Sequence, residues 1–120
     1  MTRQPTPNVT SADVERVVRH DFPAERFADV MAMLNEYGAD ESWQREADRV
    51  RLAALKLAAG SIERLRYEIE GAKADYREVL APAEFPGYCK RVGGRKKLPP
   101  EEEQRIIDAD WKQYQDWLTR

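Results

Sequence analysis

The sequence predicts an all-α fold, a compact bundle of about five helices. Three observations carry this prediction. Apolar residues recur every three or four positions through most of the chain, glycine and proline residues fall at helix-length intervals, and no convincing stretch alternates apolar and polar residues as a strand does. We expect residues 1–9 to form a flexible tail, because Pro5 and Pro7 stand there among polar residues, and residues 10–120 to form a single domain.

The centre of the fold is predicted to be an antiparallel helical hairpin over residues 43–81. A helix over residues 43–59 and another over residues 61–81 meet at Gly60 and Ser61. Glycine often ends a helix because it enters the left-handed conformation without a Cβ clash, and serine often begins one because its hydroxyl accepts an unpaired backbone N–H. The order Gly-Ser between two apolar stripes therefore indicates a tight turn between two packed helices.

The first hairpin helix is apolar on two nearly opposite sides, which is typical of a helix with neighbours on both. One side has Trp43, Ala47, Val50, Ala54 and Leu57, and the other has Leu52, Leu55 and Ala59. The second hairpin helix has one apolar side, made of Ile62, Leu65, Ile69, Ala72, Tyr76, Val79 and Leu80. We expect Pro82 to end it, because proline lacks the N–H that a helix interior needs.

Two further helices are predicted before the hairpin. Thr10 or Ser11 can cap the first, which ends before Pro23. The second starts near Pro23, because proline is tolerated in a first turn, and it runs to Tyr37, where Gly38 stops it. Its apolar residues are Phe27, Val30, Met31, Leu34 and Tyr37.

After the hairpin, residues 83–98 are predicted to be the longest irregular segment. Pro99 and Pro100 then begin the last helix, and the glutamates that follow them lie where the positive end of the helix dipole favours acids. The expected core residues of this helix are Ile107, Trp111, Tyr114 and Leu118.

Part of the chain resembles a pattern found in small bacterial helical proteins, a domain of unknown function. The similarity lies in residues 48–60 (DRVRLAALKLAAG) and residues 72–81 (AKADYREVLA), followed by Ala83 to Pro86. The resemblance implies a bacterial source and an all-helical fold. It transfers no site residue, because such proteins have no assigned activity.

Composition argues against nucleic-acid or lipid binding by the surface as a whole. The 20 basic and 22 acidic residues give a net charge of -2. Cys89, the lone cysteine, has no partner for an intramolecular disulfide, and the N-terminus lacks the apolar stretch of a secretory signal. No apolar run approaches the roughly 20 residues that cross a bilayer. We therefore expect a soluble, cytoplasmic protein with no membrane association.

No pattern resembles a catalytic, metal or cofactor site, and we expect no enzyme. Cys89 precedes two cations that can lower a thiol pKa, but no argument places His20, the single histidine, beside it. One histidine and one cysteine cannot build the usual zinc sites. The best hypothesis is a small intracellular protein-interaction or regulatory module, which binds a protein partner or a second copy of itself.

Two surfaces are candidates for that interaction. The back of the second hairpin helix has Tyr67, Gly71 and Ala74, a tyrosine beside small residues that let another backbone approach. Ile106 and Trp117 widen the apolar side of the last helix beyond one ordinary stripe. The alternative is that the first helix or the N-terminal tail covers these residues.

A basic segment supports a second hypothesis, weak sequence-independent binding of nucleic acid. The segment runs from position 90 to position 97, contains no acid and can contact phosphates through Lys90, Arg91, Arg95, Lys96 and Lys97. The alternative is a solvated loop whose cations lie near the glutamates of the last helix.

Asp110 falls inside the wide apolar side of the last helix. A carboxylate buried there needs an arginine or several N–H partners. We expect a structural pair with Arg49 or Arg51, and the alternative is a functional acid.

Overall fold

The computed structural model describes residues 5–38, 46–92 and 98–120, except for the side chains of residues 91 and 92. Over these residues the protein is all helical, as the sequence predicts, and contains no strand. It has more helices than expected. They are α1 (Ser11–Asp21), α2 (Phe27–Asn35), α3 (Ala47–Ala58), α4 (Ile62–Ala74), α5 (Arg77–Glu84), α6 (Pro86–Val92) and α7 (Pro100–Leu118), and a 3-10 turn, η1 (Ala24–Arg26), precedes α2.

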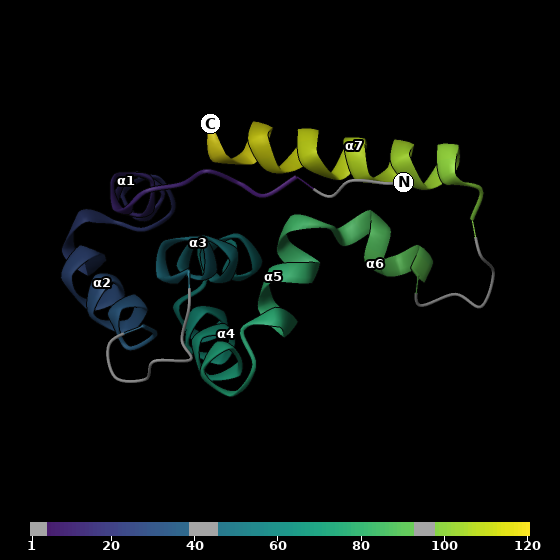
Figure 1. Ribbon diagram of the computed structural model, residues 1–120. Coiled ribbons are helices and arrows are strands. Elements are labelled where there is room, and N and C mark those ends of the chain that lie inside the picture. The colour runs from purple at the N-terminus through teal and green to yellow at the C-terminus, as the bar shows by residue number, and fades with distance from the viewer. Residues whose placement is uncertain (1–4, 39–45, 93–97) are drawn as a thin grey trace.

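Helix α3 lies at the centre of the fold, as its two apolar sides predict. It packs against α1, α4 and α5, and Figure 1 shows α7 crossing above α3, α5 and α6. The buried residues of α3 are Val50, Leu52, Ala53, Ala54, Leu55 and Ala58. Consecutive residues in the last turn of α3, Lys56 and Leu57, point toward two separate parts of the surface.

The junction between α3 and α4 has the predicted chemistry. Ala59 and Gly60 adopt left-handed conformations, with φ of 49° and 83°, and Ser61 Oγ then accepts the backbone N–H of Arg64 at 3.1 Å. A left-handed turn followed by a serine cap returns the chain within residues 59–61. Helices α3 and α4 consequently pack against each other as a helical hairpin.

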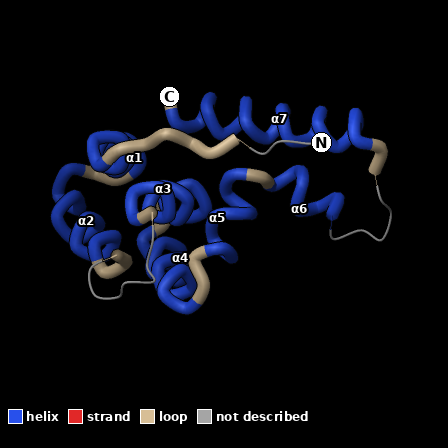
Figure 2. The backbone as a smooth tube through the Cα atoms, viewed as in Figure 1, coloured by secondary structure: helices blue, strands red, loops and turns tan. Residues whose placement is uncertain are grey.

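The prediction of one helix over residues 61–81 is wrong, because the chain breaks between α4 and α5 (Figure 2). Asp75 leaves the helical conformation, with φ -157° and ψ 104°, and its Oδ1 accepts the backbone N–H of Arg77 at 3.1 Å. A short polar side chain that bonds the backbone two residues further on competes with the helical hydrogen bond. The apolar side expected to be continuous is therefore divided between two helices.

The prediction that Pro82 ends a helix is also wrong, since α5 continues through it to Glu84. A proline in a helix interior removes one hydrogen bond and costs about 3 kcal/mol. In α5 the burial of apolar side chains around the proline offsets this cost. The buried residues are Val79, Leu80 and Ala83.

Residues 5–9 form no helix, in agreement with the sequence, but they are not a free tail. Pro7 is buried and Val9 packs against the core, and Figure 1 shows this extended segment running below α7 toward α1. The backbone N–H of Thr10 then donates to Asp13 Oδ2 at 2.9 Å and caps α1. The rest of the predicted tail, residues 1–4, lies outside the described residues.

The second predicted helix is shorter than expected, because its start is the 3-10 turn η1 and α2 ends at Asn35. Arg51 of α3 donates to carbonyl oxygens at that end, to Leu34 at 3.1 Å and to Tyr37 at 2.7 Å. The Leu34 carbonyl also accepts the backbone N–H of Tyr37 at 3.2 Å, and carbonyls at the end of a helix commonly take such side-chain donors. Arg51 therefore joins α2 to α3.

A buried ion pair joins α3 to α5. Glu84 is 2% exposed, and its two carboxylate oxygens accept hydrogen bonds from Arg49, from Nε at 2.7 Å and from Nη2 at 2.6 Å. Arg49 Nη1 donates to Glu46 Oε2 at 2.8 Å. The hydrogen bond to Glu84 is the main reason that the pKa of Arg49 is raised. Because this contact has two parallel hydrogen bonds, it fixes both the distance and the orientation of the two side chains.

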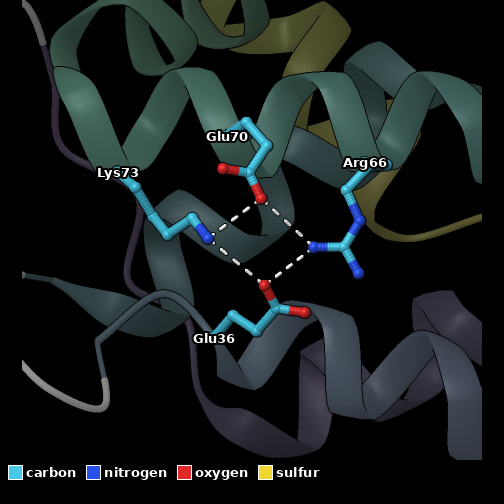
Figure 3. A network of polar contacts seen from close by, with 4 residues as sticks. All are labelled: Glu36, Arg66, Glu70 and Lys73. Atoms are coloured by element: carbon cyan, nitrogen blue, oxygen red, sulfur yellow. Dashed lines mark hydrogen bonds and ion pairs between the residues drawn. The ribbon is translucent and has the colours of Figure 1, made fainter.

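A surface network of four charged residues joins the end of α2 to α4 (Figure 3). Arg66 Nη1 lies 2.7 Å from Glu36 Oε1 and 3.2 Å from Glu70 Oε1. Lys73 Nζ lies 3.2 Å from the same oxygen of Glu36 and 2.9 Å from that of Glu70. The hydrogen bond from Arg66 is the largest cause that holds the pKa of Glu36 below its ordinary value, and the hydrogen bond from Lys73 does the same for Glu70.

Removing the Glu36 carboxylate is expected to weaken the fold in a pH-dependent way. Because folding lowers the pKa of Glu36, its contribution to stability is present above the ordinary value of 4.5 and is lost as the pH falls through the folded value. At pH 7 the Glu36→Gln variant should lose less than about 1 kcal/mol, since solvent screens the network. Urea titrations over pH should show this difference shrinking below pH 4.5, and a difference that stays constant contradicts the assignment.

Candidate functional site

Asp110 is buried, with 5% of its surface exposed, and it caps another helix. Its Oδ1 accepts the backbone N–H of Gly87 at 2.9 Å, and its Oδ2 accepts that of Tyr88 at 2.8 Å. Both N–H groups belong to the first turn of α6, where a helix has no acceptors of its own. The predicted pairing with Arg49 or Arg51 is wrong, because backbone donors bind this carboxylate while the two arginines bond elsewhere.

This capping explains why α6 forms inside residues 83–98, where the sequence predicts an irregular segment. Pro86 suits the first position of a helix because its φ is preset and no N–H is required there. The next two N–H groups find their acceptor on Asp110. A Cβ on Gly87 would lie only 2.8 Å from Asp110 Oδ1, so the absence of a side chain lets the carboxylate approach.

Cys89 and His20 lie on different helices, α6 and α1. Cys89 is exposed on α6 as a residue, but partial desolvation of its thiol, together with the charge of Asp110, raises the thiol pKa. A reactive thiolate needs the opposite shift. His20 lies in the last turn of α1, where its Nδ1 is 2.8 Å from Asp21 Oδ1. Within residues 5–38, 46–92 and 98–120, no three His, Cys, Asp or Glu side chains are grouped so as to hold a metal ion.

Most of the predicted phosphate-contacting segment lies outside the residues that the structure describes. Lys90 is exposed in α6, and Arg91 belongs to the same helix. Arg95, Lys96 and Lys97 lie outside the described part of the chain. Nucleic-acid binding through this segment therefore stays a prediction.

The predicted surface on α4 borders a groove of about 370 Å³, which we name the α4 groove. Tyr67, which is 68% exposed, and Gly71 both line it, whereas Ala74 is exposed outside it. The last turn of α3 and the helix α5 complete its walls. The apolar and small lining residues are Leu57, Tyr67, Gly71, Val79 and Pro82.

Charged residues also line the α4 groove, and acids outnumber bases. They are Arg64, Glu68, Glu70 and Glu78. Glu68 is buried and pairs with Arg64 at 2.8 Å, and Glu70 belongs to the network of Figure 3. The Arg64 guanidinium also lies 5.1 Å from the centroid of the Tyr67 ring. The groove thus combines apolar residues, an exposed aromatic ring and one exposed carboxylate, Glu78, without an ion-pair partner among the described residues.

Ile106 and Trp117 both lie on α7 and have different surroundings. Trp117 packs against the core and lines a separate pocket near the end of α7. Its ring centroid lies 5.6 Å from that of Tyr114. Ile106 is half-buried and lines neither that pocket nor the α4 groove. The predicted interaction surface on α4 coincides with the α4 groove through Tyr67 and Gly71.

Comparisons with protein-family models, with curated proteins and with solved structures find no match. None of the described helices is long and apolar enough to cross a lipid bilayer.

Proposed function

We propose that this protein is an intracellular, non-catalytic module that binds a partner protein in the α4 groove. The occupant is a helical segment that places an apolar side chain beside Tyr67 and Gly71 and has basic residues on either side of it. Tyr67 supplies the exposed aromatic surface that is enriched at protein interfaces. The volume of the groove, about 370 Å³, gives room for an apolar side chain of the partner.

The observation that carries this proposal is the glycine at position 71. A glycine in a helix interior costs about 1 kcal/mol relative to alanine. A Cβ added to Gly71 would meet no heavy atom within 4 Å, and Gly71 is absent from the residues with positive φ. Neither the packing nor the backbone of this chain therefore requires glycine there. What glycine provides at this position is space for an approach from outside.

The charge of the α4 groove selects the chemistry of the occupant. Three carboxylates and one guanidinium line it. Glu68 is already paired with Arg64, and Glu70 with Arg66 and Lys73, whereas Glu78, exposed on α5, has no ion-pair partner among the described residues. Opposite charges at the rim of an interface favour correct encounters and repel wrong partners. Basic residues that flank the apolar anchor meet this requirement, and an acidic segment or a nucleic acid does not.

The test uses two synthetic amphipathic helical peptides with the same leucine anchor, one flanked by lysines and the other by glutamates. Titration of the ¹⁵N-labelled protein should shift the backbone amides of Tyr67, Gly71 and Val79 with the lysine peptide alone. The Gly71→Leu variant should lose this binding because leucine fills the groove, whereas the matched Ala74→Leu variant on the same helix should keep it.

Stability measurements on the same position separate binding from folding. The Gly71→Ala variant should be more stable than the wild type by about 0.5–1 kcal/mol, because it removes the glycine cost without a clash. A loss of stability would mean that glycine serves the fold itself. Equal binding of both peptides, or lysine-peptide binding that survives Gly71→Leu, would contradict the proposal. Self-association abolished by Gly71→Leu, measured by light scattering, would reassign the occupant to a second copy of the chain.

A further inference from the structure

A second concave site lies where α1, α3 and α7 end, and it is separate from the α4 groove. This pocket has a volume of about 500 Å³. Helix α3 contributes to both sites through consecutive residues, with Lys56 in the pocket and Leu57 in the groove. We name it the helix-end pocket, and its polar and aromatic lining residues include His20, Asp21, Lys56, Trp117 and Arg120.

The carboxylate in the helix-end pocket is already engaged. Asp21 Oδ1 lies 2.8 Å from His20 Nδ1 and accepts a hydrogen bond from Arg120 Nη2 at 2.9 Å. The side chain of Asp21 is only 7% exposed. Its negative charge is therefore directed at His20 and Arg120, and it does not face a third cation in the pocket.

Lys56 is the cation in the pocket that does not pair with Asp21. It is half-buried in the last turn of α3. Burial lowers the pKa of its amine, and the charge of Asp110 opposes that effect. Within the described part of the chain, its ammonium group has no ion-pair partner within 4.0 Å and no hydrogen bond. A partly desolvated ammonium without an acceptor gains more from a bound anion than a fully hydrated one does.

Trp117 is the aromatic residue that lines the helix-end pocket. The guanidinium of Arg120 lies 5.1 Å from the Trp117 ring centroid, and Arg120 Nε donates to the Trp117 carbonyl at 2.9 Å. These contacts hold the guanidinium over one part of the indole ring. An anionic group and a planar apolar body can thus be contacted at the same time.

We propose that the helix-end pocket binds a small aromatic oxyanion. The anionic group lies on Lys56 and on Nη1 of Arg120, the guanidinium nitrogen that is bonded neither to Asp21 nor to the Trp117 carbonyl, and the ring lies against the part of Trp117 that lines the pocket. Phosphate monoesters and carboxylates share this chemistry. A simpler account is that the carbonyl ends of α1 and α3 attract cations whether or not a ligand is present. That account explains His20 and Lys56 as residues of the last helical turns, but it assigns no role to the pocket beside them.

The test titrates the ¹⁵N-labelled protein at constant ionic strength with phenyl phosphate, benzoate, inorganic phosphate and phenol. We expect phenyl phosphate or benzoate to shift the amides of Lys56, Gly60 and Trp117, and to bind about tenfold more tightly than inorganic phosphate or phenol. A preference between the two aromatic probes identifies the anionic group. Equal binding of phenol, or no shift at these amides, overturns the proposal.

Variants separate a binding role of Lys56 from a structural one. Lys56→Met keeps the apolar stem and should weaken binding of the preferred probe by about tenfold. Lys56→Arg should restore much of it. Lys112→Met, on the exposed side of α7, should bind as the wild type does. Unchanged binding by Lys56→Met refutes the site, and circular dichroism of each variant confirms that it is folded.

Discussion

Replacing Arg49 by methionine is expected to reduce the free energy of unfolding by about 3–5 kcal/mol. The substitution removes both hydrogen bonds that Glu84 receives from this side chain and leaves a carboxylate that is 2% exposed without its cation. Methionine keeps most of the apolar stem, so the loss reports on the charge pair more than on packing. Urea unfolding at pH 7, followed by far-ultraviolet circular dichroism, measures it.

Two control variants test whether this loss of stability depends on the burial of the ion pair. The double variant Arg49→Met with Glu84→Leu should be more stable than Arg49→Met alone, because no buried charge is left unpaired. Lys112→Met breaks the ion pair between Lys112 and Asp116, in which the lysine side chain is 77% exposed and the aspartate side chain 65%. It should change stability by less than about 0.5 kcal/mol. Similar losses for Arg49→Met and Lys112→Met would show that burial has no influence.

Replacing Asp110 by alanine is expected to cost about 2–4 kcal/mol, because two backbone N–H groups of α6 lose a charged acceptor at once. Asp110→Asn keeps one acceptor oxygen and should cost less. The matched control is Asp108→Ala, since Asp108 is exposed on the same helix and accepts a hydrogen bond from Gln104 at 2.9 Å. Urea unfolding measures the stabilities, and a control that loses as much as Asp110→Ala would contradict the capping role.

The same cap can be tested from its other side. Gly87→Ala places a Cβ only 2.8 Å from Asp110 Oδ1, so the carboxylate must move away from the N–H groups that it binds. We expect a loss of about 1–3 kcal/mol, opposite in sign to the gain expected for Gly71→Ala. Faster amide hydrogen exchange at residues 87 and 88 should accompany it. A Gly87→Ala variant as stable as the wild type would mean that the carboxylate is not held against α6.

Much of the fold could be predicted from local patterns. Helix α3 is central because its apolar residues point in two directions, and the turn at Gly60 and Ser61 depends on two residues whose conformational preferences are strong. The sequence does not predict the break at Asp75, because the apolar period continues across it. A side chain that accepts a backbone N–H two residues further on does not change that period. The continuation through Pro82 depends on tertiary burial, which overrides local propensity.

The candidate site was predictable only in part. Tyr67 and Gly71 stood out because they interrupt the polar back of an amphipathic helix. Leu57 and Val79 belong to the core as their stripes predict, and they also line the α4 groove because α5 turns away from α4 at the break. For Asp110 the sequence indicated burial and the need for partners. It could not indicate which partners, because backbone N–H groups are common to nearly all residues and carry no sequence pattern.

The cap on α6 also constrains the order in which the protein folds. Helix α6 has seven residues, too few to be stable alone in water, and the acceptor for its first free N–H lies 23 positions later in the chain. We therefore expect α6 to become stable only after α7 has been synthesised and has docked. We also expect the two helices to unfold together, so that a truncation removing α7 destabilises α6 as well.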